Sequence, residues 1–226
     1  MPVDEPLVLD ERLAQLLEPS GHDEAVGLVR DYYRPIAEGG RFEGRGFDVF
    51  EGGVLSDNDP NHLTPEDLIA VQLLHVPMSP GVITALLSTD ARKIESVLGR
   101  IGLDVVFEDP RAVELFGDHG PVEEAYHELR SIKGVGETTA TKILARKRPH
   151  LVPIIDRAVR KSLGRKRGHI WQPLQVWIQD SNHARPAELE RIRSDADLSN
   201  CPSILRIFDV LAWRVGTGKI ELPTQV

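Results

Sequence analysis

One stretch of the chain combines a glycine turn with a high density of cations around a single carboxylate. Residues 142–167 carry ten of the 27 lysines and arginines, and Asp156 is the only acid among them. Cations one helical turn apart share a helix face, and such groups bind phosphates in a salt-dependent way because they release counterions. The ten cations are Lys142, Arg146, Lys147, Arg148, Arg157, Arg160, Lys161, Arg165, Lys166 and Arg167.

The turn that precedes these cations could itself bind an anion. Lys133-Gly134-Val135-Gly136 joins two predicted helices by a very short connection, and glycine lets a ligand approach the backbone closely. The second helix is expected to begin between Gly136 and Thr138, where its first amide protons lack partners and attract negative charge. A DNA phosphate would fit there. The alternative is an ordinary helix–helix corner, with Val135 anchoring the turn on the core.

Helical periodicity is the main structural signal along the chain, and alternating strand patterns are scarce. We therefore predict an all-α fold, a multi-helix bundle that forms one domain over residues 1–226. Thr64 and Ser79 are predicted to begin helices, and the helix after Thr64 is apolar enough to be the buried central one. Residues 39–62 are interpreted as a loop or small hairpin. The other helices are predicted within residues 10–37 and around residues 94–101, 121–132, 140–144, 155–162, 170–178 and 204–215.

Composition and charge limit the classes of function. The formal net charge is −8, with 41% hydrophobic and 27% charged residues, which is typical of a globular protein. We find no apolar run long enough to span a bilayer, and the first residues lack the positive charge with which a secretory signal peptide begins. A cytoplasmic protein is expected, associated with the nucleoid if it binds DNA. Cys201 is the only cysteine, which excludes an intrachain disulfide and a cysteine-ligated metal cluster. We expect no cofactor and no metal, because the chain lacks a phosphate loop, a dinucleotide fingerprint and metal-ligand spacing of its histidines.

Two motifs resemble the helix-hairpin-helix DNA glycosylases, the endonuclease III-like superfamily. Ile132-Lys133-Gly134-Val135-Gly136-Glu137-Thr138-Thr139-Ala140 is similar to the hairpin of that family, with Lys133 in place of a proline. Pro153-Ile154-Ile155-Asp156 then matches, at the expected distance, the segment that leads into the catalytic helix. The similarity covers about residues 121–164. The stretches LLHVPMSP and ILRIFDVLAW also look like parts of an uncharacterised bacterial family with the same hairpin.

The resemblance implies roles for particular residues. Asp156 would be the catalytic aspartate, and the backbone of Gly134 to Gly136 would hold a DNA phosphate. Thr138 stands where bifunctional members have a Schiff-base lysine, so a hydrolytic, monofunctional enzyme is expected. The family's Thr-His pair after the aspartate is Arg157-Ala158 here. The full predicted DNA-binding set is Lys133, Gly134, Val135, Gly136, Thr138, Thr139, Lys142, Arg146, Arg157, Arg160 and Lys161.

An aspartate suits the chemistry that this resemblance implies. Cleaving an N-glycosidic bond builds positive charge on the deoxyribose, which a fixed carboxylate stabilises. Asp156 is expected in the first turn of its helix, where the dipole favours the ionised form. It could equally be a stabilising first-turn acid, paired with Arg160. A base pocket or wedge also needs apolar groups. The candidates are Tyr32, Tyr33, Phe42, Phe47, Trp171 and Trp177, with Phe42 and Phe47 preferred as wedges and the two tryptophans assigned to the core.

Three functions follow from these patterns. The first is a glycosylase that removes a damaged or mispaired base from duplex DNA. The second is a non-catalytic DNA-binding module that keeps the hairpin and a basic face. The third is a protein-interaction domain whose basic face meets an acidic partner. Neither the lesion nor any protein partner can be named from the sequence.

Overall fold

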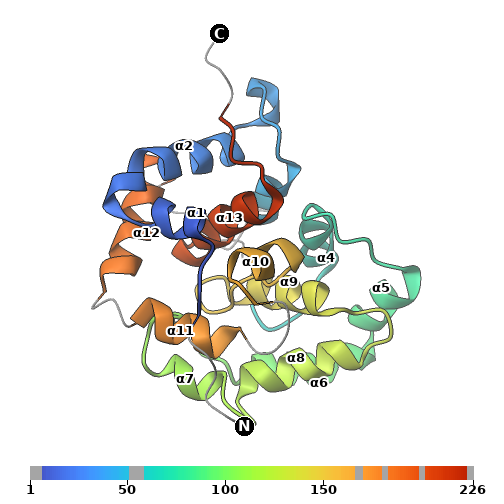
Figure 1. The fold of residues 1–226 in the computed structure, drawn as a ribbon. Helices are drawn as coiled ribbons and strands as arrows, with labels where there is room; N and C mark the ends of the chain where they lie inside the picture. Colours follow the sequence, from blue (N-terminus) through green and yellow to red (C-terminus); the bar gives the residue numbers. More distant parts are fainter. Residues whose placement is uncertain (1–6, 51–58, 166–169, 180–182, 199–201, 223–226) are drawn as a thin grey trace. The chain divides into compact units, whose positions relative to one another are not determined.

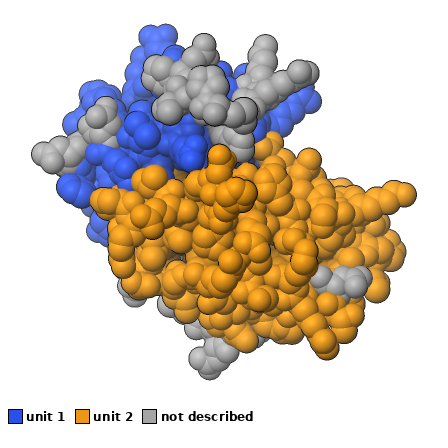
Figure 2. Space-filling model, turned by 90° about the horizontal axis from the view of Figure 1, so that it is seen from below, with its two compact units in different colours: residues 1–42, 155–226 blue, residues 43–154 orange. Residues whose placement is uncertain are grey.

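The computed structural model describes residues 7–50, 59–165, 170–179, 183–198 and 202–222, and all regular structure in these ranges is helical. The all-α class is therefore confirmed, with no strand among the described residues. The chain divides into two compact units, coloured separately in Figure 2. Unit 1 comprises residues 1–42 and 155–226, and unit 2 comprises residues 43–154. The single-domain interpretation stays a prediction.

Unit 1 is organised around α13 (Ile204–Thr217), the red helix in Figure 1. Ser203 caps this helix by accepting a hydrogen bond from the Arg206 amide. The helix is apolar on most of its circumference, and its side chains from Leu205 to Ala212 are buried, as expected for a helix surrounded by others. Four helices pack against it: α1 (Glu11–Leu16), α2 (His22–Tyr33), α10 (Arg157–Ser162) and α12 (Ala184–Asp195). The unit also contains η1 (Pro19–Gly21), η2 (Ile36–Glu38) and α11 (Trp171–Gln179).

Unit 2 has α9 (Glu137–Lys147) as its most enclosed helix, with every residue from Thr139 to Lys147 buried. The helices α4 (Pro65–Gln72) and α8 (Pro121–Ser131) pack against α9. The prediction of α4 as the buried central helix is therefore wrong: α4 ends at Gln72, and Ile69 is 44% exposed. The remaining elements are η3 (Glu43–Arg45), α3 (Gly46–Val49), α5 (Pro80–Leu86), η5 (Thr89–Ala91), α6 (Arg92–Leu98) and α7 (Ala112–Leu115).

Several local predictions are confirmed. The hydroxyl of Thr64 accepts from the Asp67 amide while the Asp67 carboxylate accepts from the Thr64 amide, which forms a capping box. Ser79 caps α5 by accepting from the Val82 amide. The loop-or-hairpin segment 39–62 instead begins with the short helical pieces η3 and α3, and residues 51–58 lie outside the described ranges. Within the described residues, no helix has both the length and the apolarity needed to cross a membrane.

Candidate nucleic-acid interface and the buried cation network

The turn between α8 and α9 has the conformation that its glycines suggested. Gly134 has a φ of +99°, in the region that side chains rarely adopt. The amide of Val135 donates to the Ile132 carbonyl at 3.0 Å, and the Val135 side chain is only 5% exposed. The turn therefore anchors on unit 2 through Val135 and leaves Lys133 and Gly134 on the surface.

The amino end of α9 is partly open to an anion. Gly136 is the N-cap residue, so no side chain caps the first amides of the helix. Such amides and the helix dipole attract negative charge. Glu137 adds one negative charge in the first turn. Of the predicted contacts just after the turn, Thr138 is half-buried and Thr139 is buried, with 8% of its surface exposed.

Two exposed cations flank this turn. Lys133 lies within it, and Arg130 lies in the last turn of α8. No hydrogen bond or ion pair joins either side chain to another described residue. Arg130 Nη1 is 3.8 Å from the position that a Cβ on Gly136 would take, so its guanidinium lies beside the turn. Sequence reasoning missed Arg130 because it precedes the hairpin motif.

The cations of α9 itself are buried, which corrects the predicted basic face. Lys142, Arg146, Lys147 and Arg148 are only 2–7% exposed. Lys142 Nζ donates to the Leu74 carbonyl at 3.0 Å. Because burial in unit 2 removes these groups from the surface, the predicted surface placement of Lys142 and Arg146 is wrong. We remove both residues from the phosphate-contacting set.

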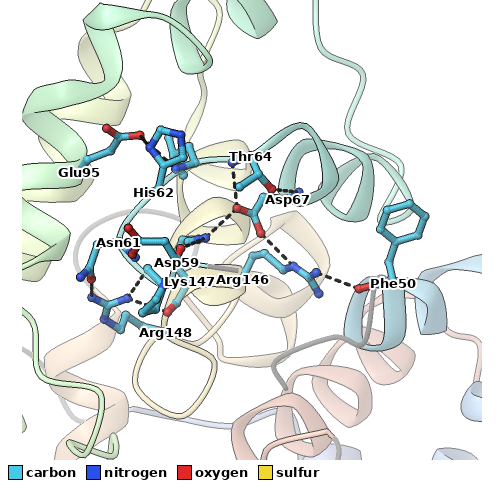
Figure 3. A network of polar contacts seen from close by, with 12 residues as sticks. Phe50, Asp59, Asn61, His62, Thr64, Asp67, Glu95, Arg146, Lys147 and Arg148 are labelled. Carbon is cyan, nitrogen blue, oxygen red and sulfur yellow. Dashed lines mark hydrogen bonds and ion pairs between the residues drawn. The ribbon is translucent and has the colours of Figure 1, made fainter. Parts of the chain in front are cut away.

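Asp67 is the carboxylate at the centre of this arrangement (Figure 3). Its Oδ1 accepts from Arg146 Nε at 3.2 Å, and its Oδ2 accepts from Lys147 Nζ at 2.8 Å. Arg146 also donates to the carbonyls of Phe47 and Phe50, and Lys147 donates to that of Asp59. We call Asp67, Lys142, Arg146, Lys147 and Arg148 the buried cation network. It ties α9 to α4 and to the segments on both sides of residues 51–58.

Arg148 completes the network without a carboxylate hydrogen bond. Its guanidinium donates to Asn61 Oδ1 (Figure 3). It also donates to the carbonyls of Pro60, Leu98 and Ile101. Burial lowers the pKa of Arg148 to about 10, and the charge of Asp59 acts in the opposite direction. The side chain therefore stays charged at neutral pH, with backbone carbonyls replacing water around it.

Asp156 is the N-cap of α10 in unit 1, one position before the first helical turn in which it was predicted. Its Oδ1 accepts hydrogen bonds from the amides of Ala158 and Val159, both at 2.9 Å. The residue is half-buried. The glycine turn belongs to unit 2 and Asp156 to unit 1, so the predicted juxtaposition of the two stays a prediction.

The cations of α10 are more accessible than those of α9. Arg157 and Lys161 are exposed, and Arg160 is half-buried. Lys161 Nζ donates to the Gly216 carbonyl at 3.2 Å, whereas no hydrogen bond or ion pair joins Arg157 to another described residue. Lys166 and Arg167 lie outside the described residues.

Most of the aromatic candidates are core residues. Tyr32, Tyr33, Phe47 and Trp171 are at most 8% exposed, so the wedge prediction for Phe47 is wrong. Phe42 is half-buried. Its ring is stacked on that of Tyr32, with 5.3 Å between the ring centroids, and lies edge-on to the ring of Trp213, with 5.8 Å between the centroids. The ring of Trp177 packs against that of Phe208, with 5.7 Å between the ring centroids, which agrees with the assignment of Trp177 to the core.

Residues 25–216 match a protein family described as a family of unknown function, DUF6308. No curated protein and no solved structure matches the chain. The family description names no activity, so the resemblance to DNA glycosylases stays a proposal. The matched range includes the glycine turn, the buried cation network and Asp156, and it spans far more than half of the sequence. The chain therefore belongs to this family of unknown function.

Proposed function

We propose that this protein binds duplex DNA through the turn between α8 and α9. The supporting observation is that two exposed cations, Arg130 and Lys133, flank an uncapped helix start and have no partner among the described residues. Backbone amides, the helix dipole and flexible cations together suit a phosphate group. The exposed Arg157 and Lys161 of unit 1 are further contacts in this proposal. The net charge of −8 does not oppose it, because screening limits charge effects to about 10 Å.

Replacing Lys133 or Arg130 with alanine should weaken DNA binding without altering the fold, because both side chains are exposed. Each change should reduce the slope of log affinity against log salt by about 1, as expected for one lost phosphate contact. The measurement is fluorescence anisotropy of a labelled duplex between about 50 and 200 mM salt, the range over which phosphate contacts alter affinity strongly.

Arg100→Ala is the matched control for this experiment. Arg100 is an exposed cation that pairs with Glu124. Glu124 lies in the first turn of α8, at the opposite end of this helix from Arg130. Its removal should leave the salt slope unchanged. If all three variants bind like the unaltered protein, the turn is not the phosphate contact. If the unaltered protein binds no duplex, the whole proposal fails.

The second candidate function is hydrolytic removal of a base, and the partial exposure of Asp156 favours it. Two amides hold this carboxylate in one orientation, as electrostatic catalysis requires. In the reaction, the bond from C1′ to the base breaks, water adds to C1′, and the proton released by water goes to the departing base. Asp156 would stabilise the cationic sugar between these events. The resemblance at Thr138 supports hydrolysis without a lyase step.

Substitutions of Asp156 separate the catalytic role from the cap. Asparagine caps helices as well as aspartate does, whereas alanine costs about 1 kcal/mol of stability. Asp156→Asn should therefore abolish alkali-revealed strand breaks on a panel of lesion-containing duplexes while the denaturation midpoint stays unchanged. Asp156→Ala should lose both activity and stability. Breaks that persist in Asp156→Asn would contradict the catalytic role, and binding without breaks in any duplex would favour the non-catalytic module.

A further inference from the structure

His22, the first residue of α2, lies between two carboxylates of α12. Its Nδ1 is 2.7 Å from Oε1 of Glu188, and its Nε2 is 2.9 Å from Oδ2 of Asp195. The His22 side chain is 22% exposed, whereas Glu188 is 4% exposed and Asp195 is 60% exposed. One imidazole ring thus connects the start of α2 to two positions of α12 that are almost two turns apart.

This geometry requires a protonated ring. A neutral imidazole has one N–H and one lone pair, so it can donate to only one carboxylate. The other nitrogen would then direct its lone pair at an anionic oxygen within 3 Å. Only the imidazolium donates from both nitrogens. The two hydrogen bonds therefore form together only while His22 carries its charge.

We propose that His22 is a pH-sensitive clasp between α2 and α12, closed on both carboxylates as the imidazolium and released from Asp195 when the ring loses its proton. Asp195 is the group released because it is exposed and water can solvate it. Glu188 is buried, and losing His22 would leave its Oε1 without this donor in a place that water reaches poorly. The neutral ring therefore keeps its N–H on Nδ1, facing Glu188.

The other charges around the clasp are compatible with this behaviour. On α2, Asp23 is exposed, Glu24 pairs with Arg12 of α1, and Arg30 donates to the Asp195 carbonyl. On α12, Arg191 pairs with the second oxygen of Glu188. The charged residues of α13 are Arg206, Asp209 and Arg214. Arg206 donates a hydrogen bond to the Tyr32 hydroxyl and Arg214 donates one to Asp31, both at the end of α2 that is remote from His22. Hydrogen bonds to Glu188 and Asp195 raise the pKa of His22, against the opposing effect of burial.

The sign of the pH dependence follows from the raised pKa. In the unfolded chain, histidine titrates near pH 6.5. Below that pH the clasp contributes its full stabilisation, and the contribution is lost as pH rises through the higher pKa of the folded state. His22→Gln should therefore lower Tm by about 2–4 °C at pH 6, the shift that a modest loss of stability causes in a chain of this size. The difference from the unaltered protein should shrink toward pH 9.

Asp195→Asn tests the clasp in a variant expected to fold, because residue 195 is exposed. The new amide can donate to the neutral Nε2, so the ring no longer needs its second proton. The midpoint of the His22 titration, followed by ¹⁵N chemical shifts of the imidazole nitrogens, should fall in this variant. Asp23→Asn is the matched control, because it removes a nearby negative charge without touching the ring, and it should lower the midpoint less.

The same spectra decide the proposal. In the unaltered protein, both ring nitrogens of His22 should keep shifts typical of imidazolium at pH values where an ordinary histidine is already losing its proton, and the titration midpoint should lie above 6.5. A midpoint at or below 6.5, or equal midpoints in Asp195→Asn and Asp23→Asn, would overturn the clasp. A Tm difference for His22→Gln that does not change between pH 6 and pH 9 would also overturn it.

Discussion

Replacing Asp67 with asparagine should lower the free energy of unfolding by about 3–5 kcal/mol, the usual cost of removing one partner from a buried ion pair. The carboxylate has hydrogen bonds to Arg146 and Lys147, and all three side chains are about 5% exposed. Without it, two cations stay buried with only carbonyl oxygens around them. Asparagine keeps only one acceptor oxygen, so its amide nitrogen must face either Arg146 or the pair formed by Lys147 and the Thr64 amide. Urea denaturation followed by circular dichroism measures the change.

Glu66→Gln is the matched control for Asp67→Asn. Glu66 is the neighbouring acid in the first turn of α4, is only half-buried and makes no hydrogen bond or ion pair to another described residue. Its replacement should stay within about 0.5 kcal/mol of the unaltered protein. Equal effects of the two substitutions would mean that helix-start charge, rather than the buried cation network, accounts for the loss. A loss below about 1 kcal/mol for Asp67→Asn would contradict the burial of the network.

Gly216→Ala should also be strongly destabilising, because α10 and α13 pack closely at this glycine. A Cβ built on Gly216 would lie 2.0 Å from the Ala158 carbonyl oxygen, far inside van der Waals contact. The oxygen is a backbone atom, so the helices must move apart, at a cost of about 3 kcal/mol. One of these two helices is α10, whose N-cap residue is Asp156. Any cleavage activity should fall as well, since a displacement of about 1 Å can cost about 100-fold in rate.

Two further substitutions test this explanation. Ala158→Gly should not rescue Gly216→Ala, because the clash involves the carbonyl and not the methyl group. Gly81→Ala, in α5, meets only the Ser79 hydroxyl oxygen at 3.9 Å, and should be neutral or stabilising by up to about 1 kcal/mol. Thermal and urea denaturation of the three variants would decide. A Gly216→Ala protein as stable as Gly81→Ala would show that α10 and α13 do not pack at this distance.

Local features of the fold followed from the amino-acid sequence because their causes lie within a few residues. Thr64 and Ser79 cap their helices through amides three positions away. Gly134 takes a positive φ in the predicted turn, and Val135 points into unit 2 as expected. Helical periodicity was sufficient for the all-α class. Propensity and capping are properties of short segments, so a single sequence can reveal them.

Only the tertiary structure decided which cations face solvent. Lys142 and Arg146 have the spacing of a basic surface stripe. Their hydrogen-bond partners, however, are separated from them by 68 to 99 positions in the sequence. The spacing of cations in the sequence is the same whether their side chains are solvated or bind a carboxylate and carbonyls from distant segments of the chain. The exposed Arg130 and the clasp at His22, whose partners lie 166 and 173 residues away, were hidden for the same reason. Burial and pairing of charges depend on long-range packing, which no local spacing contains.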